Sequence, residues 1–559
     1  MDPDVEIATN VHVAMRDGAV LRADVYRPRV NRRLPALLLR IPYNKELAQS
    51  YVYAHPLWYA RQGFVVVVQD VRGRYRSDGA FYPLRQEADD AVDTLAWLGT
   101  LPFIGEAVGM YGFSYPGKAQ LLAAARGDPR LAAIAPGFCG SGMYATAFTN
   151  GAFNLAMMVS WSIQLALDEA RWRRDRRACQ ILSDALETLP RQYATLPLRA
   201  LAPLRATGRS QFFFDMLDHP VRDAFWRDLE LGAGGFEAIG VPGLHFGGWY
   251  DTFVSETLRT FEHLSGRADQ FLLVGPWLHL PWSPWVGETD FGDAARCEID
   301  EVQVRWFRHW LVDGGRGELD LPRVRIFVMG RNEWRSEGEW PLGRARDVTF
   351  FLHSGGRANS LNGDGSLSAD PPGNEPADMF AYNPLDPVPS LGGHSCCFPH
   401  QAPMGPCDQR AVEARNDVLV YSSRGLEAPM EVTGRARVRL FVASSAATTD
   451  FTVKLVDVHA DGRAVNLCES VFRVGQATSP GRLLRDDEVR ELAFEVGVTS
   501  NWFGDGHRVR LEVSSSNFPM YDRNLNTLSP SDEWSAVVAT QRVFHTAEFA
   551  SALILPVVG

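Results

Sequence analysis

The chain has 559 residues, of which 46% are hydrophobic and 22% charged, and its formal net charge is −11. Because this length exceeds one ordinary domain, we expect about two or three domains with the composition of a globular enzyme. The acidic balance argues against a nucleic-acid partner. No stretch approaches the roughly 20 apolar residues of a membrane-spanning helix, so no membrane partner is expected.

The first part of the chain predicts strands that alternate with helices. Residues 5–43 have the pattern of an antiparallel strand pair leading into a buried strand at 34–41. A run of four valines within 63–70 is typical of a central parallel strand. The next predicted elements are a helix at 87–98, a strand at 107–111, a helix at 118–126 and a strand at 131–136. This alternation predicts the α/β class, with a parallel sheet covered on both faces.

A serine stands at the junction between one of these strands and the following helix. Residues 111–118 read Tyr-Gly-Phe-Ser-Tyr-Pro-Gly-Lys, which places Ser114 on a sharp turn. A hydroxyl is a weak nucleophile unless such a turn projects it toward a base and oxyanion donors, which is the logic of the G-x-S-x-G nucleophile elbow. Gly112 fits this pattern, but Pro116 occupies the second glycine position and Gly117 follows it. The motif therefore needs partners elsewhere in the chain.

Such partners follow in the order found in α/β-hydrolases. Residues 241–251 resemble a buried strand that ends in Asp251, and residues 270–279 resemble the next strand, which ends in His279. A segment with helical periodicity separates them, so the two strands should be parallel neighbours. We therefore predict Ser114 as nucleophile, Asp251 as orienting acid and His279 as base.

An insertion separates the serine from the aspartate. Residues 141–240 are rich in aromatic residues and arginine, with helical spacing in 161–177 and 220–231 and little strand signal. We expect this segment to form a helical cap over the site. The predicted α/β-hydrolase catalytic domain then comprises residues 1–140 and 241–345.

The sequence changes character again after residue 345. Short β-rich runs separated by Gly, Pro and Asp replace helical periodicity, which predicts an all-β jelly-roll domain over residues 346–559. The main runs are 348–352, 418–422, 430–444, 451–459 and 509–514. Residues 354–406 carry the least regular pattern.

The cysteines bear on compartment and metal binding. Seven cysteines without regular spacing fit a reducing cytoplasm better than a disulfide framework, and the first 24 residues lack the apolar core of a signal peptide, so a cytoplasmic protein is expected. The only metal-like grouping comprises His394, Cys396, Cys397, His400 and Cys407. Its spacing matches no zinc pattern with two C-x-x-C halves, and a serine hydrolase needs no metal. We expect neither a metal nor a cofactor.

Six ordered motifs give nearly the whole chain a resemblance to a known family. They are Ile-Pro-Tyr-Asn-Lys at 41–45, Gln-Asp-Val-Arg-Gly-Arg-Tyr-Arg-Ser-Asp-Gly at 69–79, Gly-Phe-Ser-Tyr at 112–115, Gly-Trp-Tyr-Asp at 248–251, Gly-Pro-Trp-Leu-His at 275–279 and Ser-Ser-Ser-Asn-Phe-Pro at 514–519. The chain resembles the cocaine esterase/nonactate hydrolase (CocE/NonD) family of serine hydrolases, related to X-prolyl dipeptidyl peptidases, α-amino acid ester hydrolases and glutaryl acylases. The resemblance implies an α/β-hydrolase domain, a helical cap, a carboxy-terminal jelly roll and a homodimer or larger homo-oligomer.

The resemblance also implies how substrate is held. In such enzymes the oxyanion is bound by the backbone N–H after the nucleophile and by a tyrosine hydroxyl after the first buried strand, here Tyr115 and Tyr43. Amino-ester hydrolases place carboxylates two and three residues after the acid, where this chain has Phe253 and Val254. We therefore expect an uncharged acyl group, with Phe253 and Trp161 as candidate walls of its pocket.

The leading hypothesis is hydrolysis of a small-molecule carboxylic ester through an acyl-enzyme, with His279 accepting the proton of Ser114 during attack. Amide or peptide hydrolysis, as in the dipeptidyl peptidase and acylase branches, is the main alternative. Acyl transfer to an alcohol or amine is another. A more distant alternative is an inactive carbohydrate-binding protein, since jelly rolls bind sugars.

Overall fold

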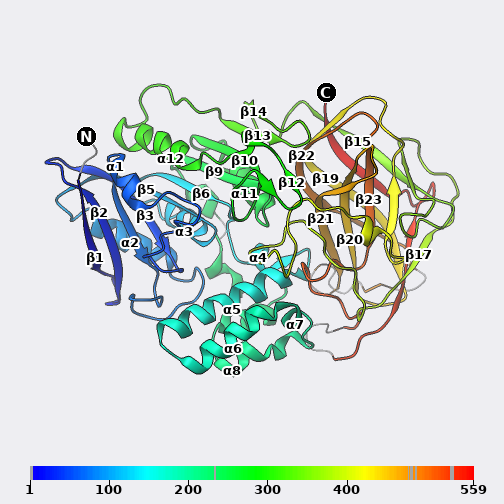
Figure 1. Cartoon of the computed structure of the whole chain (residues 1–559), viewed down its shortest axis with the longest axis horizontal. Helices are drawn as coiled ribbons and strands as arrows, with labels where there is room; N and C mark the ends of the chain where they lie inside the picture. The colour runs from blue at the N-terminus through cyan, green and yellow to red at the C-terminus, as the bar shows by residue number, and fades with distance from the viewer. Residues whose placement is uncertain (1–3, 232–233, 476–477, 479–482, 485–487, 529–533) are drawn as a thin grey trace.

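The structure, a computed structural model, describes residues 4–231, 234–475, 478, 483–484, 488–528 and 534–559. It has three parts (Figure 1): a sheet flanked by helices, a group of helices drawn in cyan, and a β-rich part formed by the last portion of the chain. Within the described residues, no helix is both long enough and apolar enough to cross a membrane.

The first sheet positions the strand ends on which the predicted site depends. Its described strands follow the order β1-β2-β4-β3-β5-β6-β9-β10-β13-β14. They are β1 (Val5–Ala14), β2 (Val20–Pro28), β3 (Leu34–Ile41), β4 (Val65–Asp70), β5 (Ile104–Phe113), β6 (Leu131–Gly137), β9 (Gly243–Tyr250), β10 (Gln270–Leu278), β13 (Val324–Val328) and β14 (Glu333–Glu337). The strands from β4 to β13 run parallel, whereas β1, β2 and β14 pair antiparallel at the edges. The predicted α/β class and the parallel pairing of β9 with β10 are confirmed.

Helices cover both faces of this sheet because alternate side chains of its central strands point to opposite sides. Val67 of β4 shares an apolar cluster with Leu95 of α2, whereas its neighbour Val66 shares another cluster with Tyr59 of α1. The flanking helices are α1 (Pro56–Arg61), α2 (Glu87–Leu98), α3 (Tyr115–Ala124), α11 (Val254–Leu264) and α12 (Ile299–Phe307). The four valines of β4 are fully buried, as their continuous apolar run predicts.

The insertion between β6 and β9 is largely helical, as expected. Its main described helices are α5 (Leu155–Trp172), α6 (Arg176–Glu187), α7 (Leu189–Tyr193), α8 (Ala202–Thr207) and α9 (Gln211–Asp218). The helical expectation for 220–231 is wrong beyond a short 3-10 turn at Ala224–Leu229. The Trp226 indole N–H donates to the carbonyls of His219 and Val221, which folds this segment back on itself instead of continuing a helix.

The C-terminal part is β-rich and has its own apolar core. Long strands β19 (Met430–Ser444) and β22 (Arg490–Phe503) pair antiparallel. The other described strands of this sheet are β15 (Ala345–His353), β16 (Ser366–Ser368), β17 (Asp378–Tyr382), β18 (Leu419–Ser422), β20 (Thr449–Val458), β21 (Ala464–Val474), β23 (Arg508–Ser514), β24 (Ala539–Phe544) and β25 (Ala552–Val558). Strand β15 begins where the first sheet has ended, so the chain enters this part between 337 and 345.

The two sheets are joined by backbone and side-chain contacts. The Met329 N–H donates to the Ser500 carbonyl at 2.9 Å, and the Trp502 N–H donates to the Met329 carbonyl at 2.8 Å. Arg335 forms a two-pronged ion pair with Glu431 of β19, at 2.6 Å for each contact. These contacts fix the C-terminal part against β13 and β14, at the edge of the first sheet next to β9 and β10.

Candidate active site

The serine turn is held in a backbone conformation that side chains rarely adopt. Ser114 has φ 64° and ψ −125° between the end of β5 and the start of α3. A Cβ on Gly112 would meet Leu39 and Pro116 at 2.6 Å, and one on Gly117 would meet the Cys139 sulfur at 2.6 Å. Proline is tolerated at 116 because N–H groups of a first helical turn lack internal partners. The second glycine is therefore needed one position later, where α3 packs against the chain after β6.

Three strand ends bring the predicted catalytic residues together. The Ser114 Oγ lies 3.1 Å from His279 Nε2, and His279 Nδ1 lies 2.8 Å from Asp251 Oδ1. Asp251 follows β9 and is fully buried, while His279 follows β10 and is 2% exposed. A carboxylate on Nδ1 keeps the hydrogen there and leaves Nε2 free to accept a proton from the hydroxyl. This arrangement can activate Ser114 as a nucleophile.

The hydroxyl of Tyr43 borders the same serine. The Trp161 Nε1–H donates to the Tyr43 oxygen at 3.0 Å, which leaves the tyrosine's own hydrogen available for another acceptor. Burial raises the pKa of Tyr43 to about 12, so the hydroxyl stays protonated near neutral pH. The backbone is anchored two residues later, where the Lys45 N–H donates to the buried Asp70 carboxylate at 2.7 Å.

The side chain of Tyr115 points away from the serine. Its hydroxyl donates to Glu87 on α2 at 2.8 Å and accepts from the Leu84 N–H at 3.1 Å. Only its backbone N–H, in the first turn of α3, is available to the site. Glu87 in turn forms a buried ion pair with Arg40 of β3 at 2.9 Å, so the elbow is tied to the centre of the sheet.

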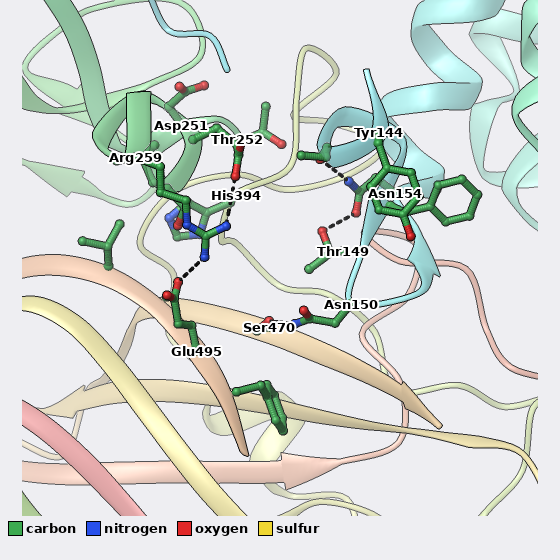
Figure 2. Close-up of a pocket in the computed structure, with 18 of the residues that line it drawn as sticks. Tyr144, Thr149, Asn150, Asn154, Asp251, Thr252, Arg259, His394, Ser470 and Glu495 are labelled. Carbon is green, nitrogen blue, oxygen red and sulfur yellow. Dashed lines mark hydrogen bonds and ion pairs between the residues drawn. The ribbon is translucent and has the colours of Figure 1, made fainter. Parts of the chain in front are cut away.

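Ser114 and His279 open onto a cavity of about 280 Å³. It is lined by Tyr43, Leu47, Tyr51, Tyr75, Phe113, Ser114, Met157, Trp161, Gln164, Asp168, His279, Leu280, Cys396, Cys397 and Phe398. A larger cavity of about 630 Å³, shown in Figure 2, is lined by Asp251 among others, but its described lining includes neither Ser114 nor His279. The smaller cavity is therefore the candidate active site, although the larger one offers more space.

The two predicted acyl-pocket residues differ in position. Trp161 of α5 lies on the cavity wall. Phe253 instead packs edge-on against the His279 ring, with centroids 5.2 Å apart, and is not among the described residues that line the cavity. The buried Lys118 ammonium lies 4.7 Å from the centroid of the Phe253 ring and holds it beneath the histidine.

Two cysteines of the metal-like grouping at 394–407 are bonded to each other. Cys396 and Cys397 form a disulfide with each other, which the cysteine count did not predict. With Phe398 they form a wall of the small cavity, contributed by the C-terminal part. No sequence signal connected this irregular segment with Ser114, because the contact depends on how the two sheets pack.

His394 supports the acid from the C-terminal side, beside Asp251 in Figure 2. Its Nδ1 lies 2.9 Å from the Glu469 carboxylate, and its Nε2 lies 2.7 Å from the Trp249 carbonyl. Both partners can only accept hydrogen bonds, so both ring nitrogens carry hydrogens and the ring is cationic. Burial opposes this charge, but Glu469 raises the pKa of His394 above its usual value. The end of β9 is therefore clamped by an ion pair that sequence analysis missed.

Comparisons with known proteins agree with this architecture. Residues 17–281 match the X-Pro dipeptidyl-peptidase (S15) family, and residues 318–554 match the X-Pro dipeptidyl-peptidase C-terminal non-catalytic domain. The chain is 38% identical over 582 aligned residues to a cocaine esterase of Rhodococcus sp. (strain MB1 Bresler), and the alignment covers 100% of both chains.

Two solved structures share the fold. An aminopeptidase from a marine sediment archaeon, Thaumarchaeota archaeon, is 24% identical with a TM-score of 0.81, covering 100% of this chain and 97% of its own. An α-amino acid ester hydrolase is 24% identical with a TM-score of 0.80 and the same coverage of both chains. Both similarities extend over all three parts of the chain.

The backbone at Ser114 generates a stability prediction. At a positive φ, glycine avoids the strain that any Cβ experiences, so Ser114→Gly should be about 1 kcal/mol more stable than Ser114→Ala. Both variants lose the hydroxyl, so their comparison isolates the backbone. Differential scanning calorimetry should place the Tm of Ser114→Gly about 1 °C above that of Ser114→Ala, because a chain of 559 residues has a large unfolding entropy. An equal or lower Tm would show that the turn is unstrained.

Proposed function

The chain belongs to the cocaine esterase/nonactate hydrolase family of serine hydrolases, and we propose that it hydrolyses a carboxylic ester through an acyl-enzyme on Ser114. The observation that carries this proposal is the hydrogen-bond chain from Ser114 through His279 to Asp251, with distances of 3.1 and 2.8 Å. At its Ser114 end, this chain of contacts opens onto a cavity large enough for a small acyl group.

Acylation begins when Ser114 Oγ attacks the ester carbonyl carbon and its proton passes to His279 Nε2. Asp251 stabilises the resulting imidazolium through the Nδ1–H. When the tetrahedral intermediate collapses, the bond between the carbonyl carbon and the alcohol oxygen breaks, and His279 returns the proton to the leaving alcohol. Water then attacks the acyl-enzyme by the same route, which releases the acid and restores the Ser114 hydroxyl.

The negative oxygen of the intermediate needs donors fixed in advance. We assign this role to the Tyr43 hydroxyl and the Tyr115 backbone N–H. Tyr43 suits it because Trp161 already occupies an acceptor position on its oxygen, and because its raised pKa keeps its hydrogen in place. A donor of this kind contributes about 3–4 kcal/mol in a site shielded from water.

An uncharged acyl group is the substrate class that this site favours. Phe253 and Val254 stand where amino-ester hydrolases carry carboxylates, and both are buried and apolar. The cavity wall contributed by Trp161, Met157 and Phe398 is also apolar. Asp168 is the one carboxylate among the described residues lining the cavity, and it lies 3.9 Å from the Arg74 guanidinium.

Amide hydrolysis is a second candidate, because the matched family takes its description from a dipeptidyl peptidase. A free peptide amino terminus would need a carboxylate near the acyl pocket, and Asp168 is already paired with Arg74. Acyl transfer uses the same acyl-enzyme and differs only in the acceptor. The inactive carbohydrate-binding alternative gains no support from a site in which each predicted catalytic group has a partner.

Paired substrates test the ester assignment. p-Nitrophenyl butyrate should be turned over rapidly, and the matching p-nitroanilide much more slowly, by the native chain. Ser114→Ala should abolish the ester activity, lowering kcat by about 10⁶-fold, because removing a nucleophile leaves only binding and oxyanion effects. Comparable turnover of the anilide would reassign the enzyme to the peptidase and acylase branch. Full ester turnover by Ser114→Ala would refute the mechanism.

Tyr43→Phe tests the oxyanion assignment. The variant should lose about 10²–10³-fold in kcat, with KM nearly unchanged, because the hydroxyl binds the transition state more strongly than the substrate. Tyr51→Phe is a matched control, since Tyr51 also lines the cavity but has no assigned part in catalysis. Equal losses in the two variants would contradict a specific role for Tyr43.

A further inference from the structure

A group of metal-ligand side chains lies in the C-terminal part, away from the serine site. Asp457 is on β20, His459 is in the turn between β20 and β21, and His507 directly precedes β23. Each can present one ligand atom so that all three atoms lie within 4.8 Å of one another. These residues differ from the grouping that sequence spacing had singled out, because antiparallel pairing of β20 with β21 and β23 brings them together.

Hydrogen bonding within the protein uses only a small part of this group's capacity. His507 Nδ1 lies 2.8 Å from Asp457 Oδ1, and the Asn501 amide donates to Asp457 Oδ2 at 3.0 Å. Among the described residues, the other His507 nitrogen and both His459 nitrogens have no hydrogen-bond partner. The two rings nevertheless lie with centroids 4.5 Å apart, at an interplanar angle of 32°.

The surroundings suit a cation that can enter from solvent. Asp457 is buried, 3% exposed, whereas both histidines are half-buried and reachable. Besides Asp457 and His507, the charged groups of Asp461 and Arg463 in the same turn act on His459, and their opposite charges act in opposite directions. A buried carboxylate beside two imidazoles with open nitrogens is an N₂O ligand set. Such a set binds first-row transition metals such as Zn²⁺ in preference to Mg²⁺ or Ca²⁺.

We propose that Asp457, His459 and His507 bind a divalent transition-metal ion, with water completing its coordination. The half-buried His459 closes on the ion by side-chain rotation, while Asp457 is already oriented by Asn501. Binding requires neutral imidazoles and releases any proton that they hold, so affinity falls as the pH is lowered.

The position of the site points to a structural effect on the seam between the two sheets. Asn501, which orients Asp457, forms a bridge with Met329 next to β13. A bound ion would connect the β20–β21 turn to the segment between β22 and β23, and so brace the strand that contacts the first sheet. Its effect should therefore be on stability, with no direct part in ester hydrolysis.

Cobalt titration tests the proposal on the full chain without a polyhistidine tag. Co²⁺ should give a saturable visible d–d absorption band, and Zn²⁺ should displace it. His459→Ala and His507→Ala should each abolish the band, whereas His12→Ala, at an exposed histidine on β1, should not affect it. Asn501→Ala should weaken binding by about 10–100-fold through loss of the orienting contact.

Thermal melting supplies a second readout. Saturating Zn²⁺ should raise the Tm by about 3 °C in the native chain and in His12→Ala, but not in His459→Ala or His507→Ala. Ester turnover by the two histidine variants serves as the check that they are folded. Absence of a saturable cobalt band in the native chain, or a band that survives both substitutions, would overturn the proposal.

Discussion

The backbone turn at Ser114 is the constraint on which the remainder of the site depends. Ser114 has φ 64° where β5 passes into α3, and the turn is packed so closely that a Cβ at position 112 or 117 would clash with its surroundings. Gly112 and Gly117 provide close approach on either side, and Pro116 fits the first turn of the helix. The resulting projection brings the hydroxyl to the carboxyl edge of the parallel sheet, where β9 and β10 end in the acid and the histidine.

The C-terminal part is integral to this site. It contributes Cys396, Cys397 and Phe398 to the cavity wall, and its His394–Glu469 ion pair clamps the carbonyl of Trp249, two residues before Asp251. Asp251 Oδ2 has no hydrogen-bond partner among the described residues, so the nearby imidazolium of His394 is an electrostatic support for its charge. Movement of one sheet relative to the other would therefore disturb both Asp251 and the cavity wall that contacts the substrate.

Much of this arrangement could be predicted because it is encoded locally. The valine run of β4, the helix at Glu87–Leu98 and the strand ends at Asp251 and His279 all follow from short-range patterns and the order of elements. What could not be predicted comes from packing between distant segments. The cavity wall formed by the Cys396–Cys397 disulfide and the residue His394 both lie in a segment without a regular sequence pattern. Phe253 packs between His279 and the Lys118 ammonium, and sequence spacing does not connect Phe253 with Lys118.

The assignment of Ser114 as nucleophile is the claim that supports the rest, and covalent labelling tests it most directly. A fluorophosphonate should phosphonylate the native chain at one serine, with peptide mass spectrometry locating the adduct on Ser114. The adduct should be absent in Ser114→Ala and should form far more slowly in His279→Ala, because the hydroxyl then lacks its base. An adduct on a different serine, or labelling that persists in Ser114→Ala, would contradict this account.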